Sequence, residues 1–283
     1  MTEASALWEL LRQTADPAVA DALRAAVEIG PDRSLCRVDS LAFAAAHELG
    51  EEPVISTLVH AARLGLFDMA WNVLCPGCGG VLETGAALKT LNRAEYACSL
   101  CAADYSPTLD DLVEVTFTVS PKIRRIGAHD PDTLSLTDYM RQIFWGSGIE
   151  FPDDLDGELD KVTLDVMDLA PGEKAAMSLT LPAEFGIIFD PVTHTAVFLD
   201  VGGEPTTERR SLSVVLSETT AQSATHQLRP GPVRIAIENK SARSSRRCGS
   251  RRPGWSCAPT CFQWRCGPGR VSTGGWRSAQ SCR

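Results

Sequence analysis

Two Cys-x-x-Cys pairs constrain this chain more than any other feature. Cys75-Pro-Gly-Cys78 and Cys98-Ser-Leu-Cys101 are separated by nineteen residues. Four thiolates at this spacing satisfy the tetrahedral coordination that a structural Zn²⁺ requires. The segment between the pairs has the length of a strand pair, so the sequence predicts a four-cysteine zinc ribbon over residues 67–111.

The predicted zinc is structural. Four cysteines close the coordination shell, which leaves no position for a substrate or an activated water. A redox dithiol and an iron–sulfur site are the alternatives that paired cysteines also allow. A metal held in this way stabilises a segment too small to fold on its own core, and it is no evidence of catalysis.

The charge of the chain is unevenly distributed. Nine of its 27 basic residues are arginines that follow Lys240, where no acidic residue occurs. Residues 1–240 therefore hold 18 basic and 36 acidic residues, a net charge of −18. An acidic body of this kind makes nucleic acid an unfavourable partner.

Two further features bear on location. The N-terminus lacks the basic and apolar segments of a signal peptide, and no apolar run reaches the ~18–20 residues that cross a bilayer. Thiols spaced for metal also indicate a reducing compartment. We therefore expect a cytoplasmic protein with no membrane partner.

The composition changes abruptly after Lys240. Residues 241–283 contain five of the ten Cys and three of the six Trp, but no Leu, Ile or Met and no apolar periodicity. Such a segment cannot bury a core, so we expect a disordered tail over residues 241–283. Its residue types are those that GC-rich codons encode out of frame, which favours the hypothesis of a frameshift product.

Three other interpretations of this tail are open. Arginines with interleaved tryptophans suit a basic RNA-binding arm. Cys257, Cys261 and Cys266 offer a second metal site, although their spacing fits no common pattern. A disulfide framework conflicts with the reduced thiols expected in the body.

Residues 1–66 have the pattern of a helical module. Residues 39–50 and 51–65 each carry an apolar stripe ended by glycine, as in the helix-turn-helix of a winged-helix fold. A DNA-reading version needs basic residues on its second helix, which here carries Glu51, Glu52 and Arg63. The pattern favours a winged-helix-like module that packs against protein.

After the ribbon the apolar pattern changes to a period of two. Val113–Val119 alternates apolar and polar residues, and later alternating runs are separated by Gly and Pro turns. Many short strands of this kind predict an antiparallel β-sandwich over residues 112–240. The expected fold class is therefore α+β, with a helical region, a zinc ribbon, a sandwich and a tail.

No catalytic motif is present. Neither phosphate-binding glycine pattern occurs, and the acidic run at residues 153–160 fails the EF-hand pattern because Pro152 stands where the first Asp belongs. The five histidines form no HxH or HExxH cluster, and Cys36 stands alone. We therefore expect a protein that is not an enzyme.

Three segments carry a family resemblance. AARLGLFDMAWNVLCPGC at residues 61–78, CSLC at 98–101 and VEVTFTVSPKIR at 113–124 resemble the zinc-ribbon-bearing domain of unknown function that precedes bacterial class III adenylate/guanylate cyclase domains. LRPGPVRIAIEN at residues 228–239 is similar to the end of that domain. The resemblance covers about residues 1–240.

This resemblance implies a regulatory or sensory input module whose partner is a cyclase domain or another protein. Cyclases of this class work as dimers, so the resemblance also implies a homodimer. The catalytic residues of a cyclase cannot be placed on this chain. The alternatives are a winged-helix plus zinc-ribbon regulator that binds nucleic acid, and a stand-alone protein-interaction scaffold.

Overall fold

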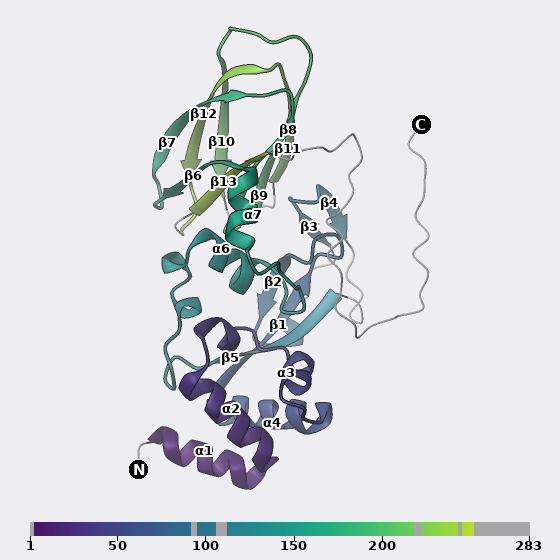
Figure 1. The fold of residues 1–283 in the computed structure, drawn as a ribbon, viewed down its shortest axis with the longest axis vertical. Helices are drawn as coiled ribbons and strands as arrows, with labels where there is room; N and C mark the ends of the chain where they lie inside the picture. The colour runs from purple at the N-terminus through teal and green to yellow at the C-terminus, as the bar shows by residue number, and fades with distance from the viewer. Residues whose placement is uncertain (1–2, 92–94, 106–111, 218–221, 243–244, 252–283) are drawn as a thin grey trace, which may run out of the picture.

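The computed structural model describes residues 3–91, 95–105, 112–217, 222–242 and 245–251. The protein is a mixed α+β structure, with helices at its N-terminal end and sheets toward its C-terminal end (Figure 1). The disorder predicted for residues 252–283 lies outside the described residues, as do residues 92–94 and 106–111 of the predicted ribbon.

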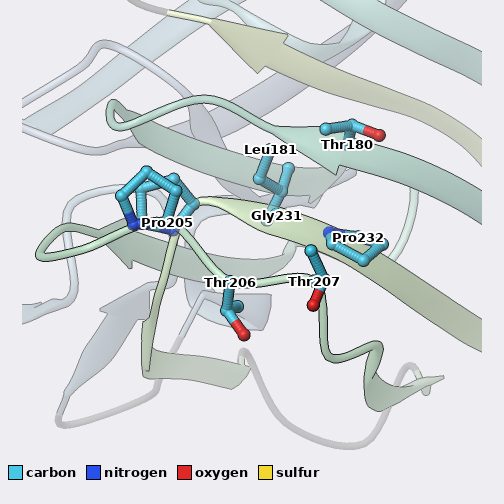
Figure 2. Close-up of a pocket in the computed structure, with 8 residues that line it drawn as sticks. Thr180, Leu181, Pro205, Thr206, Thr207, Gly231 and Pro232 are labelled. Atoms are coloured by element: carbon cyan, nitrogen blue, oxygen red, sulfur yellow. The ribbon is translucent and has the colours of Figure 1, made fainter.

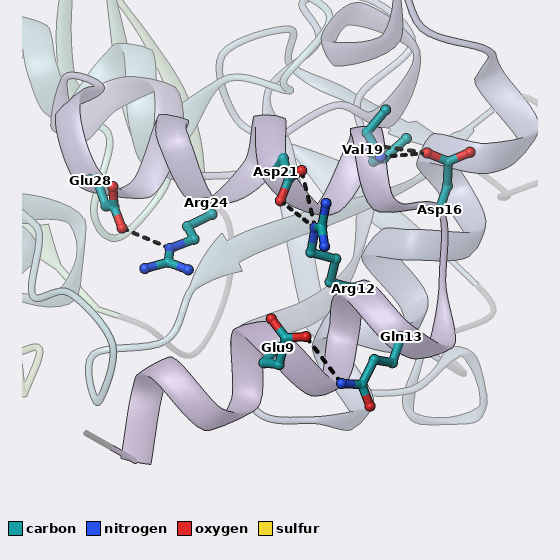
Figure 3. A network of polar contacts seen from close by, with 9 residues as sticks. Glu9, Arg12, Gln13, Asp16, Val19, Asp21, Arg24 and Glu28 are labelled. Carbon is teal, nitrogen blue, oxygen red and sulfur yellow. Dashed lines mark hydrogen bonds and ion pairs between the residues drawn. The ribbon is translucent and has the colours of Figure 1, made fainter. Parts of the chain in front are cut away.

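Four helices and a 3₁₀ turn form the N-terminal module. They are α1 (Glu3–Thr14), α2 (Pro17–Ile29), η1 (Asp32–Leu35), α3 (Ser40–Ala46) and α4 (Glu51–Arg63). Asp16 begins α2, because its carboxylate accepts hydrogen bonds from the backbone N–H groups of Ala18 and Val19 (Figure 3). An exposed ion pair between Arg12 and Asp21 joins α1 to α2, 3.1 Å from Nε to Oδ1.

These helices cover one face of a small antiparallel sheet of order β2-β1-β5. Its strands are β1 (Phe67–Leu74), β2 (Val81–Gly85) and β5 (Val113–Val119). Buried side chains of α1, α2, η1 and α4 pack against Phe67 and Phe117 of this sheet. Val38, between η1 and α3, forms an isolated antiparallel bridge with Phe117. The helices and the sheet therefore share one core.

The segment between β2 and β5 holds a second short hairpin. η2 (Leu88–Thr90) precedes β3 (Tyr96–Cys98), which pairs antiparallel with β4 (Ala103–Tyr105). The β3–β4 hairpin lies beside β2, at the edge of the β2-β1-β5 sheet (Figure 1).

A stretch of short helices then leads to the C-terminal sheets. It consists of η3 (Gly127–His129), η4 (Pro131–Thr133), α6 (Leu136–Tyr139), the π-helix η5 (Met140–Phe144) and α7 (Leu155–Val162). Aromatic side chains of this connector, with Phe144 at their centre, form a core of their own against Ile187 and Phe189.

Two sheets pack face to face at the C-terminal end. Their strands are β6 (Thr163–Leu169), β7 (Lys174–Leu181), β8 (Phe185–Asp190), β9 (Thr195–Val201), β10 (Arg210–Leu216), β11 (Gln222–Leu228), β12 (Gly231–Asn239) and β13 (Ser245–Arg251). One sheet has the order β10-β12-β7 and the other β11-β9-β8-β13-β6. Alternate apolar residues, such as Val233, Ile235 and Ile237 of β12, fill the space between them.

Three expectations need correction. Pairing is antiparallel between most neighbouring strands, but β10 with β12 and β11 with β9 are parallel. Val113–Val119 pairs with β1 and belongs to the N-terminal sheet, because alternation predicts a strand without specifying its neighbour. Ser245–Arg251, expected to be disordered, forms a strand between β6 and β8, because backbone pairing requires no apolar side chains.

Candidate metal centre

The four predicted cysteines lie together although they come from two separate hairpins. Cys75 follows β1 and Cys78 lies in the turn to β2, while Cys98 ends β3 and Cys101 lies in the turn to β4. Their four Sγ atoms all lie within 4.8 Å of one another. Cys75 and Cys98 are each only 2% exposed. The two turns thus place four sulfur atoms around one point that is largely shielded from water.

The distances between the sulfur atoms suit a tetrahedral ion. The Sγ atoms of Cys75 and Cys101 are 3.7 Å apart, and so are those of Cys78 and Cys98. A tetrahedron with metal–sulfur bonds of about 2.3 Å has an edge of about 3.8 Å. A disulfide requires about 2.05 Å, and all four cysteines are free. The donor set and its spacing therefore fit Zn²⁺.

Both turns place a residue in the left-handed conformation directly after their second cysteine, although the hydrogen bond that closes each turn differs. In the first turn, the N–H of Gly79 donates to the carbonyl of Cys75 over 2.8 Å, and Gly79 has a φ of +69°. In the second, the N–H of Ala102 donates to the carbonyl of Ser99 over 3.2 Å, and Ala102 has a φ of 49°. A left-handed residue directly after the second cysteine thus reverses the chain in each turn, with glycine in one and alanine in the other.

The thiols perturb one another's protonation. Hydrogen bonding with neighbouring thiols, that of Cys101 first, lowers the pKa of Cys75. Hydrogen bonding with the same neighbours raises the pKa of Cys78. Burial and the nearby Cys75 raise the pKa of the Tyr105 hydroxyl. Four thiolates this close repel one another strongly, so they need a cation at their centre.

The second turn docks on the β-sandwich. The hydroxyl of Ser99 donates a hydrogen bond to the backbone carbonyl of His194, which lies in the tight connection between β8 and β9. Burial lowers the pKa of His194 to about 4, so this imidazole is neutral near pH 7. Its ring packs 5.2 Å from that of Phe144, and Leu100 joins the same apolar cluster.

The first turn docks on the connector. Gly80 bridges to Trp145, and the N–H of Gly146 donates to the carbonyl of Gly79 over 2.9 Å. A Cβ at Gly80 would lie 3.1 Å from the Phe144 ring and 3.3 Å from the Cys78 sulfur, so the close approach depends on glycine. The four-cysteine centre therefore contacts the connector and the sandwich as well as the N-terminal sheet.

A partly buried arginine, Arg37, adds a second link between the N-terminal module and the connector. Arg37 donates from Nη1 to the carbonyls of Ile143, at 2.5 Å, and Trp145, at 3.3 Å. Burial lowers the pKa of this guanidinium, and the nearby Glu114 partly offsets the effect. The adjacent Cys36 thiol has its pKa raised to about 11, also by burial. A partly buried thiol of raised pKa is a poor nucleophile.

Sequence reasoning found the sulfur ligands but missed the residues around them. Ser99, Arg37, Phe144 and His194 come from four separate segments, and no spacing motif connects them. The local signals for the turn geometry are the glycines around Cys78, which are Gly77, Gly79 and Gly80.

An open groove lies at a different part of the sandwich. It has a volume of about 530 Å³ and is formed by the end of β7, the start of β12 and the loop before β10 (Figure 2). Threonine, proline, leucine and glycine line it: Thr180, Leu181, Pro205, Thr206, Thr207, Pro230, Gly231 and Pro232. Among the described residues, this lining offers no titratable group for acid–base chemistry.

The fold and the cysteine cluster together define a mixed α+β protein with a candidate metal centre at the junction of its parts. In comparison with known families, residues 1–247 match one described as a family of unknown function (DUF5939), and the chain belongs to that family. No curated protein and no solved structure gives a significant match. Among the described residues, no helix combines the length and the apolar character that a membrane span requires.

Proposed function

We propose that this chain is a non-catalytic, zinc-binding regulatory module, in which one structural Zn²⁺ holds the helical end to the β-sandwich. The observation that carries the proposal is the position of the four sulfur atoms, within 4.8 Å of one another at the point where three parts of the protein meet. Zinc would be held by Cys75, Cys78, Cys98 and Cys101, and it would balance the charge of their thiolates.

The contacts around the sulfur atoms support a coupling role. Zinc fixes the two turns, and each turn then presents a backbone or hydroxyl group to a different neighbour. The first turn meets Gly146 of the connector, and the second reaches His194 of the sandwich through Ser99. Loss of the metal frees both turns, so the relative position of the helical end and the sandwich becomes dependent on zinc.

The regulatory part of the proposal rests on sequence resemblance. Residues 61–78 and 98–101 are similar to the domain that precedes class III adenylate/guanylate cyclase domains. We propose accordingly a cytoplasmic module whose partner is a cyclase domain or another protein, acting as a homodimer. A stand-alone interaction scaffold is compatible with the same residues.

The alternative, a winged-helix regulator, is supported by the order of elements. The helix α2 is followed by Val38, which bridges to β5, and then by the helices α3 and α4. The paired strands β1 and β5 come after them. The exposed side of α4 argues against nucleic acid, because it carries Glu51, Glu52, Ile55 and Val59 and a single arginine, Arg63. Acidic and β-branched side chains suit contact with another protein better than contact with the phosphates of nucleic acid.

Metal analysis tests the zinc proposal. The purified chain is expected to contain about one zinc per chain by inductively coupled plasma mass spectrometry, and Cys75→Ser and Cys98→Ser are expected to lose it. Cys36→Ser is the matched control, since this free thiol lies outside the cluster. Equal zinc content in all four proteins would contradict the site.

A cyclase assay tests the regulatory part. The rate of cyclic nucleotide formation by a class III cyclase domain is measured alone, with the zinc-loaded chain and with Cys75→Ser. The proposal predicts that the zinc-loaded chain changes the rate and that the variant does not. A rate that neither protein changes would contradict regulation of the cyclase and would favour the scaffold.

A further inference from the structure

The five-stranded sheet contains one strand that joins two otherwise separate parts. β13 pairs antiparallel with β6 on one side and with β8 on the other. In the sheet order β11-β9-β8-β13-β6, β6 reaches the rest of the sheet through β13 alone. Without a strand in this position, β6 and β8 would both present unpaired backbone groups. The space between β6 and β8 is called here the strand slot.

The chain is directed into the strand slot by a buried corner. Asn239 ends β12 in the opposite sheet, and its side-chain amide donates to the carbonyl of Leu169 over 2.9 Å. The N–H and hydroxyl of Ser241 both donate to the Asn239 side-chain oxygen, over 3.0 and 2.7 Å. Asn239 is fully buried and Ser241 is 6% exposed. Hydrogen bonds therefore fix the point at which the chain leaves β12.

Several residues of β13 are polar or glycine, although the residues opposite them in β6 and β8 are apolar. Its register sets Ser245 opposite Leu169, Arg247 opposite Met167 and Gly249 opposite Ile188. Those three partners belong to the apolar core between the sheets, where Leu169 is 1% and Ile188 is 5% exposed. The described positions of β12 at the same core are Val233, Ile235 and Ile237. Serine, arginine and glycine thus occupy register positions at which the sandwich elsewhere uses apolar residues.

We propose that the strand slot is an acceptor site for an extended peptide strand of a partner protein, with an apolar residue at every second position. β13 is then a weak occupant that such a strand displaces. The incoming strand runs antiparallel to β6 and β8, takes over the backbone hydrogen bonds of β13 and adds apolar side chains at the core positions. This inference does not depend on zinc, because β13 lies outside the four-cysteine centre.

A peptide-binding experiment on the full chain tests this proposal. The probe is a fluorescein-labelled peptide of sequence Val-Lys-Ile-Thr-Val-Lys-Val, and its control holds the same residues in an order without alternation. Fluorescence anisotropy is expected to show saturable binding of the alternating peptide, at least about tenfold tighter than that of the control, since alternating apolar residues reach the core face and scrambled ones do not.

A variant with apolar residues in β13 itself completes the test. The triple substitution Ser245→Val, Arg247→Ile and Gly249→Val is expected to raise the melting temperature and to weaken probe binding at least about tenfold, because its own strand now competes. Binding that is equal for the two peptides, or that the triple variant leaves unchanged, would overturn the proposal, since it would place the probe on another surface.

Discussion

Ala102 and Gly79 occupy equivalent positions in the two cysteine turns, each with a positive φ directly after the second cysteine. The left-handed conformation costs a non-glycine residue about 1–2 kcal/mol, while glycine loses about 0.5–1 kcal/mol more conformational freedom on folding. Ala102→Gly is therefore expected to raise the free energy of unfolding by up to about 1 kcal/mol. Urea denaturation of the zinc-loaded protein measures this change.

The reverse substitution in the other turn serves as its counterpart. Gly79→Ala adds a methyl group that overlaps the Ile149 side chain, at a φ that alanine disfavours. It is expected to lower the free energy of unfolding by about 1–3 kcal/mol. If Ala102→Gly proves as destabilising as Gly79→Ala, the turns do not share the geometry described.

Cys36 is expected to make the stability of the protein sensitive to alkaline pH. Burial raises its pKa to about 11, whereas the unfolded chain releases this proton near pH 9. Between these values the folded state holds the proton and the unfolded state does not, so stability is lost as the pH rises from about 9 to about 11. Two pKa units correspond to about 2.7 kcal/mol.

The change is measured by comparing the pH dependence of unfolding for the protein and for Cys36→Ala. The variant is expected to lose about 2–3 kcal/mol less over this pH range, because the titrating thiol is gone. Parallel curves for the two proteins would show that the thiol is not buried as described.

At the scale of elements, one hydroxyl connects the second cysteine turn to the β8–β9 hairpin. Ser99→Ala removes the donor to the His194 carbonyl and leaves that acceptor without this partner. The expected loss is about 1–2 kcal/mol in the free energy of unfolding, with zinc content unchanged. Ser34→Ala is the matched control, since its exposed hydroxyl bonds the Pro31 carbonyl and its loss is expected to cost under about 0.5 kcal/mol.

Elements differ in how far their sequences determine them. Leu212–Leu216 and Val233–Ile237 alternate apolar and polar residues, and both are strands in the structure. Their mutual pairing was not predictable, because parallel pairing of β10 with β12 depends on chain topology rather than on local pattern. β13 was missed for the opposite reason. Its composition gives no strand signal, and backbone pairing with both neighbours places it in the sheet.

At the scale of the whole molecule, the cysteines were predictable and their surroundings were not. Cysteines that hold a metal occur at characteristic spacings along the sequence, so the four cysteines could be found without a structure. Arg37 and His194 reach the junction from segments far apart in the chain, and only tertiary packing brings them there. The proposed role comes from the resemblance to cyclase-associated domains. The family match shows which family the chain belongs to, and the function of that family is unknown.

Amide hydrogen exchange shows whether zinc couples the helical end to the sandwich. Exchange is followed by mass spectrometry on the zinc-loaded chain and on the chain treated with a zinc chelator. Chelation is expected to remove protection from both cysteine turns and from the hairpin connection at 190–195, while β12 stays protected. Unchanged exchange at 190–195 would contradict this coupling, because the sandwich would then be independent of the metal.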